Sequence, residues 1–129
     1  MQLFFSTAQL LHKPLKFVVA GRVGEPLENP ERVVTLCDRL TEAGLHIADP
    51  GDHGMAPIRK VHDAGYLDFL ECAHAEWMKL PNAGPEVWPN VHPYRGTGAD
   101  LDRAGPPEGG IVGQAGWYVG DLAAAIGER

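Results

Sequence analysis

The sequence predicts an α/β layer fold. Short runs of β-type residues alternate with longer stretches of helical periodicity, in the order strand, helix, strand, helix, which is typical of layered α/β domains. At 129 residues the chain has the length of about one domain. Only three short strands are recognisable, which is few for a sheet covered on both faces. The sequence therefore predicts the first part of a larger unit.

Three strands are predicted. The β-type runs Leu3–Phe5 and Lys16–Val19 are separated by a polar stretch, and Leu45–Ala48 forms a third short run. Between the second run and the first helix, Gly21–Pro26 contains two glycines and a proline. These residues predict a loop.

The first helix is predicted to begin at Pro30 and to end near Ala43. Asn29 can cap it, and proline suits the first helical position. Apolar residues recur along one face of this segment, and Gly44 is a suitable terminator.

A second helix is predicted after Asp63, its candidate cap, with a short helical segment at residues 57–62 before it. Apolar side chains recur at helical spacing and predict a buried stripe. The stripe consists of Tyr66, Phe69, Leu70, Ala73, Trp77 and Leu80.

The charge and composition exclude two classes of partner. Acidic residues outnumber basic residues by 17 to 11, so the concentrated basic face of a nucleic-acid-binding protein is missing. No apolar run approaches the roughly 20 residues that span a membrane, and the first residues lack the basic region of a signal peptide. With only two cysteines, Cys37 and Cys72, the chain is expected to be cytoplasmic.

One cluster of residues has the chemistry of a metal site. His46, Asp49, Asp52 and His53 carry nitrogen and carboxylate ligands that suit a divalent ion. They lie, however, in a turn, where aspartate and glycine are common for backbone reasons alone. The turn interpretation is favoured, and a small metalloprotein is the weaker alternative.

Other pairs of residues also have a structural interpretation. Asp63, beside His62, is better explained as a helix cap than as the partner of a catalytic base, because adjacent helical residues point about 100° apart. Glu71 and His74 have the carboxylate–histidine spacing of di-iron bundles, but the further helices of such a bundle are missing. Neither a nucleophile elbow nor a glycine-rich phosphate loop is present. No catalytic residue and no metal ligand is therefore assigned in this chain.

Several stretches, taken in order, resemble one family. FFSTAQLLHKP, PLENPERV, HGMAPIRKVHDAGYLDFL, WPNVHPYR and VGQAGWYVGDLAAAIG look like the amino-terminal portion of bacterial acetylpolyamine amidohydrolases and related histone-deacetylase-like enzymes. The resemblance implies an arginase/deacetylase-type three-layer fold with a parallel sheet. It also implies zinc-dependent hydrolysis of N-acetyl amides of small amines, or of acetyl-lysine.

The resemblance also implies a division of the chain. Residues 1–80 would form a β/α scaffold, residues 81–112 an irregular insertion loop, and residues 113–129 a segment at the rim of the active site. The family's metal ligands and catalytic residues have no counterpart here. The zinc would therefore belong to the full-length enzyme, and this chain alone is expected to be inactive.

The residues that carry over are peripheral. Arg32 matches an arginine that lines a channel thought to release acetate, and a guanidinium suits a carboxylate. The alternative is that Arg32 pairs with Glu28 or Glu31. Tyr118 matches a position at the substrate rim.

Two acidic residues are further rim candidates. Phe17, Val112 and Ala123 stand at positions where polyamine-selective members carry acidic groups, which leaves polyamine selectivity open against another small acetylated amine or amide. Glu25, Glu108 and Asp121 lie close by in the sequence and are candidate substitutes, and Glu25 and Asp121 are the rim candidates among them.

The irregular segment is the candidate contact of a homodimer. In the resembling enzymes the matching insertion builds the dimer contact, and interfaces favour aromatic residues. Trp88, His92 and Tyr94 are the candidates. The alternative to an enzyme portion is a stand-alone, non-catalytic binding or dimerisation module derived from the same fold.

Overall fold

The computed structural model describes residues 2–89, 91–92, 109–121 and 125–128. Four short strands, three α-helices and two 3-10 helices are present in this part of the chain. In chain order they are β1 (Leu3–Phe4), η1 (Thr7–Leu11), β2 (Phe17–Val19), β3 (Arg22–Gly24), α1 (Pro30–Glu42), β4 (Ile47–Ala48), η2 (Ile58–Lys60), α2 (Ala64–Trp77) and α3 (Gly110–Tyr118).

A parallel strand pair lies at the amino-terminal end of the fold. β1 pairs with β4, with Leu3 opposite Ile47 and Phe4 opposite Ala48. Parallel strands need a crossover connection, and α1 lies within the connection here. This arrangement confirms the predicted α/β class and its parallel sheet.

The loop predicted at Gly21–Pro26 is wrong, because β3 lies within it and pairs antiparallel with β2. Ala20 and Gly21 have φ values of 49° and 75°, and a two-residue hairpin turn of type I′ requires positive φ at both positions. The three-residue strand Arg-Val-Gly is too short, and too close to glycines, to show an alternating pattern.

α1 begins and ends where its sequence predicts. The Asn29 side chain accepts a hydrogen bond from the Arg32 N–H at 3.2 Å, and Pro30 occupies the first turn. The helix ends at Glu42, and Gly44 follows with a φ of 79°. Its apolar side packs on η1, a 3-10 helix in the stretch expected only to be polar.

The core is formed by α2 and α3. Asp63 caps α2 as predicted, and its carboxylate accepts hydrogen bonds from the N–H groups of Gly65 and Tyr66. The predicted apolar stripe is confirmed, because its members are either buried or packed against the buried cluster. That cluster consists of Phe69, Ala73, Trp77, Val87, Ile111 and Ala115.

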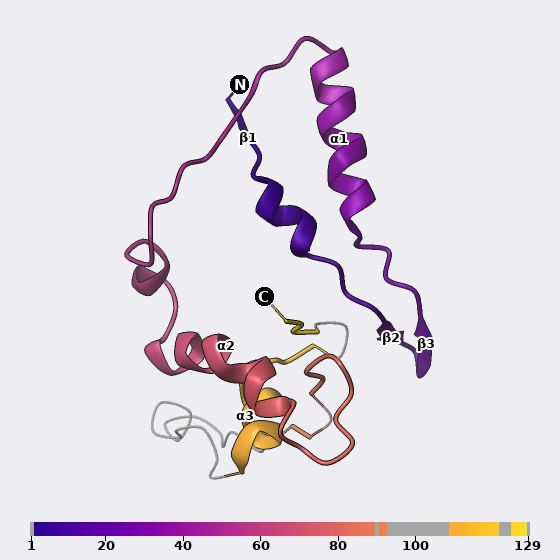
Figure 1. The fold of residues 1–129 in the computed structure, drawn as a ribbon, viewed down its shortest axis with the longest axis vertical. Coiled ribbons are helices and arrows are strands. Elements are labelled where there is room, and N and C mark those ends of the chain that lie inside the picture. The colour runs from indigo at the N-terminus through magenta and orange to yellow at the C-terminus, as the bar shows by residue number, and fades with distance from the viewer. Residues whose placement is uncertain (1, 90, 93–108, 122–124, 129) are drawn as a thin grey trace.

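Figure 1 shows an open arrangement of these elements. α1, η1 and the parallel pair lie at one end of the molecule, and α2 and α3 lie at the other. The chain between β4 and η2 runs from one end to the other without helix or strand. Asp49 and Asp52 make turns in this connection by accepting hydrogen bonds from the N–H groups of Gly51 and Gly54.

Many apolar side chains are exposed for so short a chain. Among the described residues, thirteen large hydrophobic side chains are exposed, whereas six hydrophobic residues are buried. No helix in the described ranges is long and apolar enough to cross a membrane.

Candidate functional site

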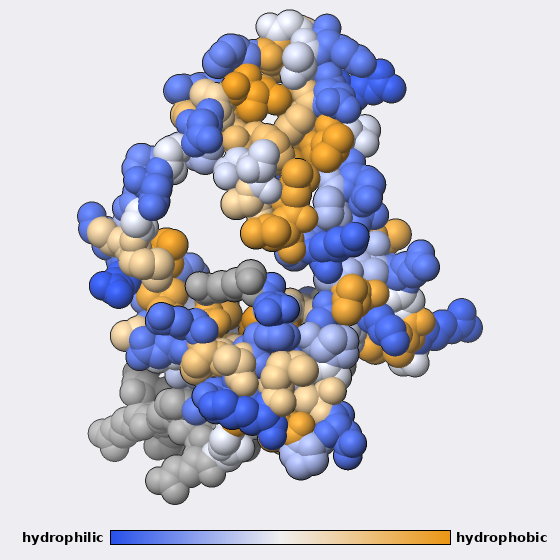
Figure 2. All heavy atoms as spheres, in the orientation of Figure 1, coloured by the Kyte–Doolittle hydropathy of each residue, from blue (hydrophilic) through white to orange (hydrophobic). Residues whose placement is uncertain are grey.

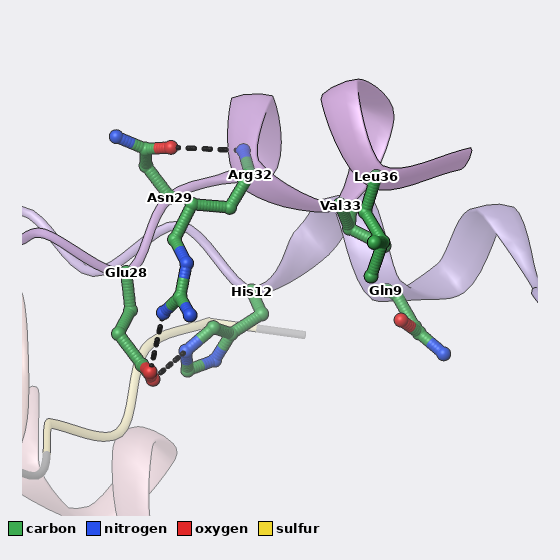
Figure 3. A pocket seen from close by; sticks show the side chains of 7 residues that line it. All are labelled: Gln9, His12, Glu28, Asn29, Arg32, Val33 and Leu36. Atoms are coloured by element: carbon green, nitrogen blue, oxygen red, sulfur yellow. Dashed lines mark hydrogen bonds and ion pairs between the residues drawn. The ribbon is translucent and has the colours of Figure 1, made fainter. Parts of the chain in front are cut away.

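Arg32 lines a cavity of about 360 Å³ between η1 and α1. Its guanidinium pairs with the Glu28 carboxylate at 2.7 Å, and the His12 ring lies 3.9 Å from the other carboxylate oxygen (Figure 3). Gln9 and Val33 form part of the wall. The Arg32 guanidinium therefore lies at a cavity, but the Glu28 carboxylate already neutralises its positive charge.

Asp121 lies at a second cavity, of about 470 Å³, which shares His12 and Glu28 with the first. Phe17 also lines it. Arg32 and Asp121, which are far apart in the sequence, are thus brought to neighbouring cavities. Glu25 is exposed and does not line either cavity, and Glu108 lies outside the described residues.

Tyr118 lies at the end of α3, over the first turn of α2. Its ring stacks on Phe69, with centroids 5.0 Å apart, and contacts Tyr66 at 5.8 Å. Burial raises the pKa of Tyr118 above its ordinary value of 10.0, and the charges of Asp63 and Asp68 raise it further. The hydroxyl is therefore protonated at neutral pH, and it lies against the backbone of α2 at Gly65.

The described part of the 81–112 segment is anchored by a buried carboxylate. One oxygen of Glu86 accepts a hydrogen bond from the Leu15 N–H at 2.8 Å, and the other accepts one from the Trp88 indole at 3.4 Å. Glu86 is only 7% exposed. Val87 forms an antiparallel bridge with Ile126.

The three dimer-loop candidates are placed differently. The Trp88 indole is bonded to Glu86, and a ring nitrogen of His92 lies 3.3 Å from the Gly116 carbonyl oxygen. Tyr94 lies outside the described residues. α3 begins at Gly110, within the stretch expected to be irregular.

The candidate metal cluster proves to be a pair of turns. Asp49 and Asp52 each bond a backbone N–H two residues ahead, while His46 and His53 are exposed. Within the described ranges, no three His, Cys, Asp or Glu residues are grouped so that they could hold a metal ion.

The histidines of the pairs His62–Asp63 and Glu71–His74 both make structural contacts. The His62 ring packs on Tyr66 with centroids 5.5 Å apart, beside the confirmed cap Asp63. A ring nitrogen of His74 lies 3.0 Å from the Pro85 carbonyl oxygen. Both histidines therefore contact neighbouring segments through their rings.

Sequence reasoning missed Glu86 and His12. Glu86 is the only charged residue in the run Pro85–Pro89, and a lone carboxylate in an apolar segment is a signal for a buried acceptor. His12 follows η1 and lines both cavities described above. No local pattern marks it, because the residues around it come from distant segments.

Comparison with known proteins gives one consistent group of relatives. The chain is 33% identical over 130 residues to an acetylpolyamine amidohydrolase of Burkholderia pseudomallei, and 32% identical over 123 residues to acetylpolyamine amidohydrolase 1 of Pseudomonas aeruginosa. It is also 32% identical to the acetylpolyamine amidohydrolase of Mycoplana ramosa. No family model matches.

A solved structure agrees with the sequence relatives. The crystal structure of acetylpolyamine aminohydrolase from Burkholderia pseudomallei matches with a TM-score of 0.85 and 34% identity, and the match covers 99% of this chain. The chain is homologous to part of the acetylpolyamine amidohydrolases. This confirms the family that the sequence motifs indicate and the α/β fold that they imply.

The match covers only part of each acetylpolyamine amidohydrolase. The chain spans about a third of the length of the relatives that it matches: 36% of the Burkholderia protein, 34% of the Pseudomonas protein and 35% of the solved chain. Both cavities and Tyr118 lie within this third.

Proposed function

We propose that this chain forms part of a zinc-dependent deacetylase that hydrolyses N-acetyl amides of small amines, such as acetylpolyamines, or of acetyl-lysine. The proposal is carried by the similarity along the whole chain to acetylpolyamine amidohydrolases, in sequence and in fold. The chain's role would be to supply the frame and the rim of the site. A bound zinc ion would polarise the acetyl carbonyl and activate water.

The described residues do not form a zinc site by themselves. No suitable group of three ligands is present among them, and the turn carboxylates at Asp49 and Asp52 are used by the backbone. We therefore propose that the metal ligands belong to sequence that this chain does not contain, and that the chain alone does not release acetate.

Arg32 is the proposed contact for the acetate product. Its cavity is large enough for a small carboxylate, and its guanidinium faces Glu28. An incoming carboxylate must compete with Glu28 for the guanidinium. That pair is exposed, and an exposed ion pair is worth about 0–1 kcal/mol, so the competition is feasible.

Two groups of rim residues are proposed to meet the substrate. Tyr118 has a hydroxyl that remains a donor at neutral pH, which suits a substrate carbonyl or amide oxygen. Asp121, which faces a cavity, and Glu25 carry the carboxylates that a substrate ammonium requires.

We further propose a cytoplasmic homodimer in which the 81–112 segment forms the contact. Trp88, His92 and Tyr94 give this segment the aromatic composition of an interface. The division into a scaffold at 1–80, an insertion at 81–112 and a rim segment at 113–129 belongs to the same proposal.

A chimera tests the enzymatic proposal. This chain replaces the matching third of the Burkholderia pseudomallei relative, and acetate release from N-acetylated diamines and an acetyl-lysine peptide is measured with and without a zinc chelator. The chimera is expected to release acetate until the metal is removed, whereas the chain alone is expected to release none. Zinc-dependent acetate release by the chain alone would contradict the division of roles.

The stand-alone binding module is the competing proposal. It requires the isolated chain to be monodisperse and cooperatively folded, and it requires the folded chimera to release no acetate from any of these substrates. The many exposed hydrophobic side chains weigh against it, because a self-sufficient domain covers such surface.

A further inference from the structure

His12, Glu28 and Arg32 form a connected charged group at the cavity between η1 and α1. The Glu28 carboxylate lies between the other two side chains (Figure 3). One of its oxygens accepts a hydrogen bond from the Arg32 guanidinium at 2.7 Å, and the other lies 3.9 Å from Nε2 of His12. A single carboxylate therefore faces two groups that can carry positive charge. One of the two is an imidazole, which ordinarily changes its charge between pH 5 and 8.

The fold brings these side chains together from separate segments. His12 directly follows η1, and its backbone N–H donates to the Gln9 carbonyl oxygen. Arg32 lies in the first turn of α1, where its backbone N–H donates to the side chain of the cap Asn29. Because η1 and α1 pack on each other, the His12 ring is placed beside the carboxylate that neutralises Arg32.

The protonation of His12 decides the net charge of this cavity. Three of the residues that line it are ionisable, and the charges of Arg32 and Glu28 cancel. With a neutral His12 ring the cavity carries no net charge, and with a protonated ring it carries one positive charge. The protonated ring also competes with Arg32 for the Glu28 carboxylate. Both effects favour the entry of an anion in the protonated state.

Other charged groups surround His12, which also lines two neighbouring cavities. Besides Glu28, the ionisable residues described in their walls are Lys13, His74, Glu86, Asp121 and Glu128. Carboxylates and ammonium groups ordinarily keep their charge where histidine titrates. His74 is the exception among these residues, and it does not line the Arg32 cavity. It is therefore a matched control for His12.

The walls of the Arg32 cavity suit a small carboxylate with a short apolar group. A guanidinium is a good partner for a carboxylate, and the Gln9 side chain adds an amide that can donate a hydrogen bond. Val33 and Leu36 project from α1 toward η1 (Figure 3), and Figure 2 shows hydrophobic atoms gathered over these two elements. Acetate combines a carboxylate with a methyl group in this way.

We propose that His12 is a pH-sensitive control of the Arg32 cavity: its protonated ring draws on the Glu28 carboxylate and leaves the Arg32 guanidinium to bind a small carboxylate such as acetate. The proposal rests on the role of Arg32 in the proposed function and adds the regulation of that site. An acidic solution favours the bound state. A rise of pH through the range in which histidine loses its proton favours release.

The test is the binding of acetate to this chain at about pH 5.5 and about pH 7.5, which lie within and above the range where an ordinary histidine is protonated. Ionic strength is held constant, and the chain is kept at a concentration where light scattering gives the mass of a monomer. Binding is followed through the nuclear magnetic resonance signals of the Gln9 side-chain amide and the Arg32 backbone N–H.

The wild-type chain is expected to bind acetate about three- to fivefold more tightly at the lower pH, because one exposed charge pair changes an equilibrium by up to about fivefold. His12→Gln should bind weakly at both pH values. His12→Lys, with a permanent positive charge, should bind at both as the wild type does at the lower pH. His74→Gln should keep the wild-type pH dependence, and Arg32→Gln should lose binding.

Equal affinity of the wild-type chain at the two pH values would overturn the proposal. So would a pH dependence that survives in His12→Gln or disappears in His74→Gln. The absence of any acetate-induced shift at either pH would overturn it together with the role of Arg32.

The chimera described above separates this proposal from the proposed function. A chimera that releases acetate, combined with pH-independent binding of acetate to this chain, would refute the control by His12 and leave the proposed function standing. A chimera that releases none, combined with the expected behaviour of the His12 variants, would refute the proposed function and leave the control by His12 standing.

Discussion

At the residue scale, the contact between Tyr118 and Gly65 is the tightest constraint on the α2–α3 pair. A Cβ at position 65 would lie 2.6 Å from the Tyr118 hydroxyl oxygen and 3.1 Å from a carboxylate oxygen of Asp63. Gly65 has an ordinary negative φ, so the reason for glycine here is space and not backbone conformation. The Tyr118 side chain on α3 can therefore pack against α2 in this position only because residue 65 has no side chain.

Gly65→Ala is therefore expected to destabilise the protein, although alanine is normally the better helix former. Overpacking of this kind costs about 1–3 kcal/mol. Urea unfolding should show the loss, and the same substitution in a Tyr118→Phe background should cost much less, because the hydroxyl is gone. An equal loss in both backgrounds would mean that the clash lies with the Asp63 carboxylate instead.

The raised pKa of Tyr118 gives a second prediction at this scale. The folded protein holds the phenolic proton more tightly than the unfolded chain, so this contribution to stability is complete below pH 10 and is lost as the pH rises through the folded pKa. A titration of tyrosinate absorbance, with Tyr118→Phe as the subtracted control, should show Tyr118 ionising above its ordinary range.

Asp68→Asn removes one of the two charges that act on Tyr118 without touching the cap of α2. The pKa of Tyr118 should fall only part of the way, because burial is the largest cause of the shift. A return to the ordinary value would show that the charges dominate instead.

At the scale of elements, Glu86 joins segments that are distant in the sequence. Its carboxylate holds the Leu15 N–H after η1 and the Trp88 indole in the 81–112 segment. Glu86→Ala is expected to destabilise the protein by about 1–3 kcal/mol, because two partly buried donors, the Leu15 N–H and the Trp88 indole, lose their acceptor. Thermal unfolding followed by tryptophan fluorescence measures this.

Glu86→Gln is the matched control, since it keeps an acceptor oxygen at nearly the same size. It should recover part of the loss, with one of the two bonds retained. A glutamine variant as unstable as the alanine variant would show that the charge, and not the hydrogen bonds, holds the segments together.

The sequence predicted elements with local signals and missed those that depend on distant contacts. The caps Asn29 and Asp63, the terminator Gly44 and the apolar stripe of α2 are all readable within one helix. β3 was missed because a three-residue strand is defined by its partner and its turn. Glu86 and the cavities around His12 were missed because their neighbours come from several elements.

At the scale of the whole molecule, the isolated chain is expected to bind hydrophobic dyes and to self-associate as its concentration rises. The exposed side chains of Leu11, Leu15, Leu27 and Leu36, which line the cavities around His12, supply the binding area. Leu27→Asp should lower dye fluorescence and the weight-average mass in light scattering. Val61→Asp, an equally exposed position between η2 and α2, is the control and should change both less. Equal effects would mean that the exposed hydrophobics act independently and form no common surface.

The parallel pairing of β1 with β4 has a consequence for the order in which the chain folds during its synthesis. Leu3 leaves the ribosome first, but its partner Ile47 follows only after the hairpin and the whole of α1 have been made. Until then the amino-terminal strand has no backbone partner, and pairing across such a separation is slow. The nascent chain thus carries an unpaired apolar strand through a long interval of translation, and this strand is where chaperone binding during synthesis should concentrate.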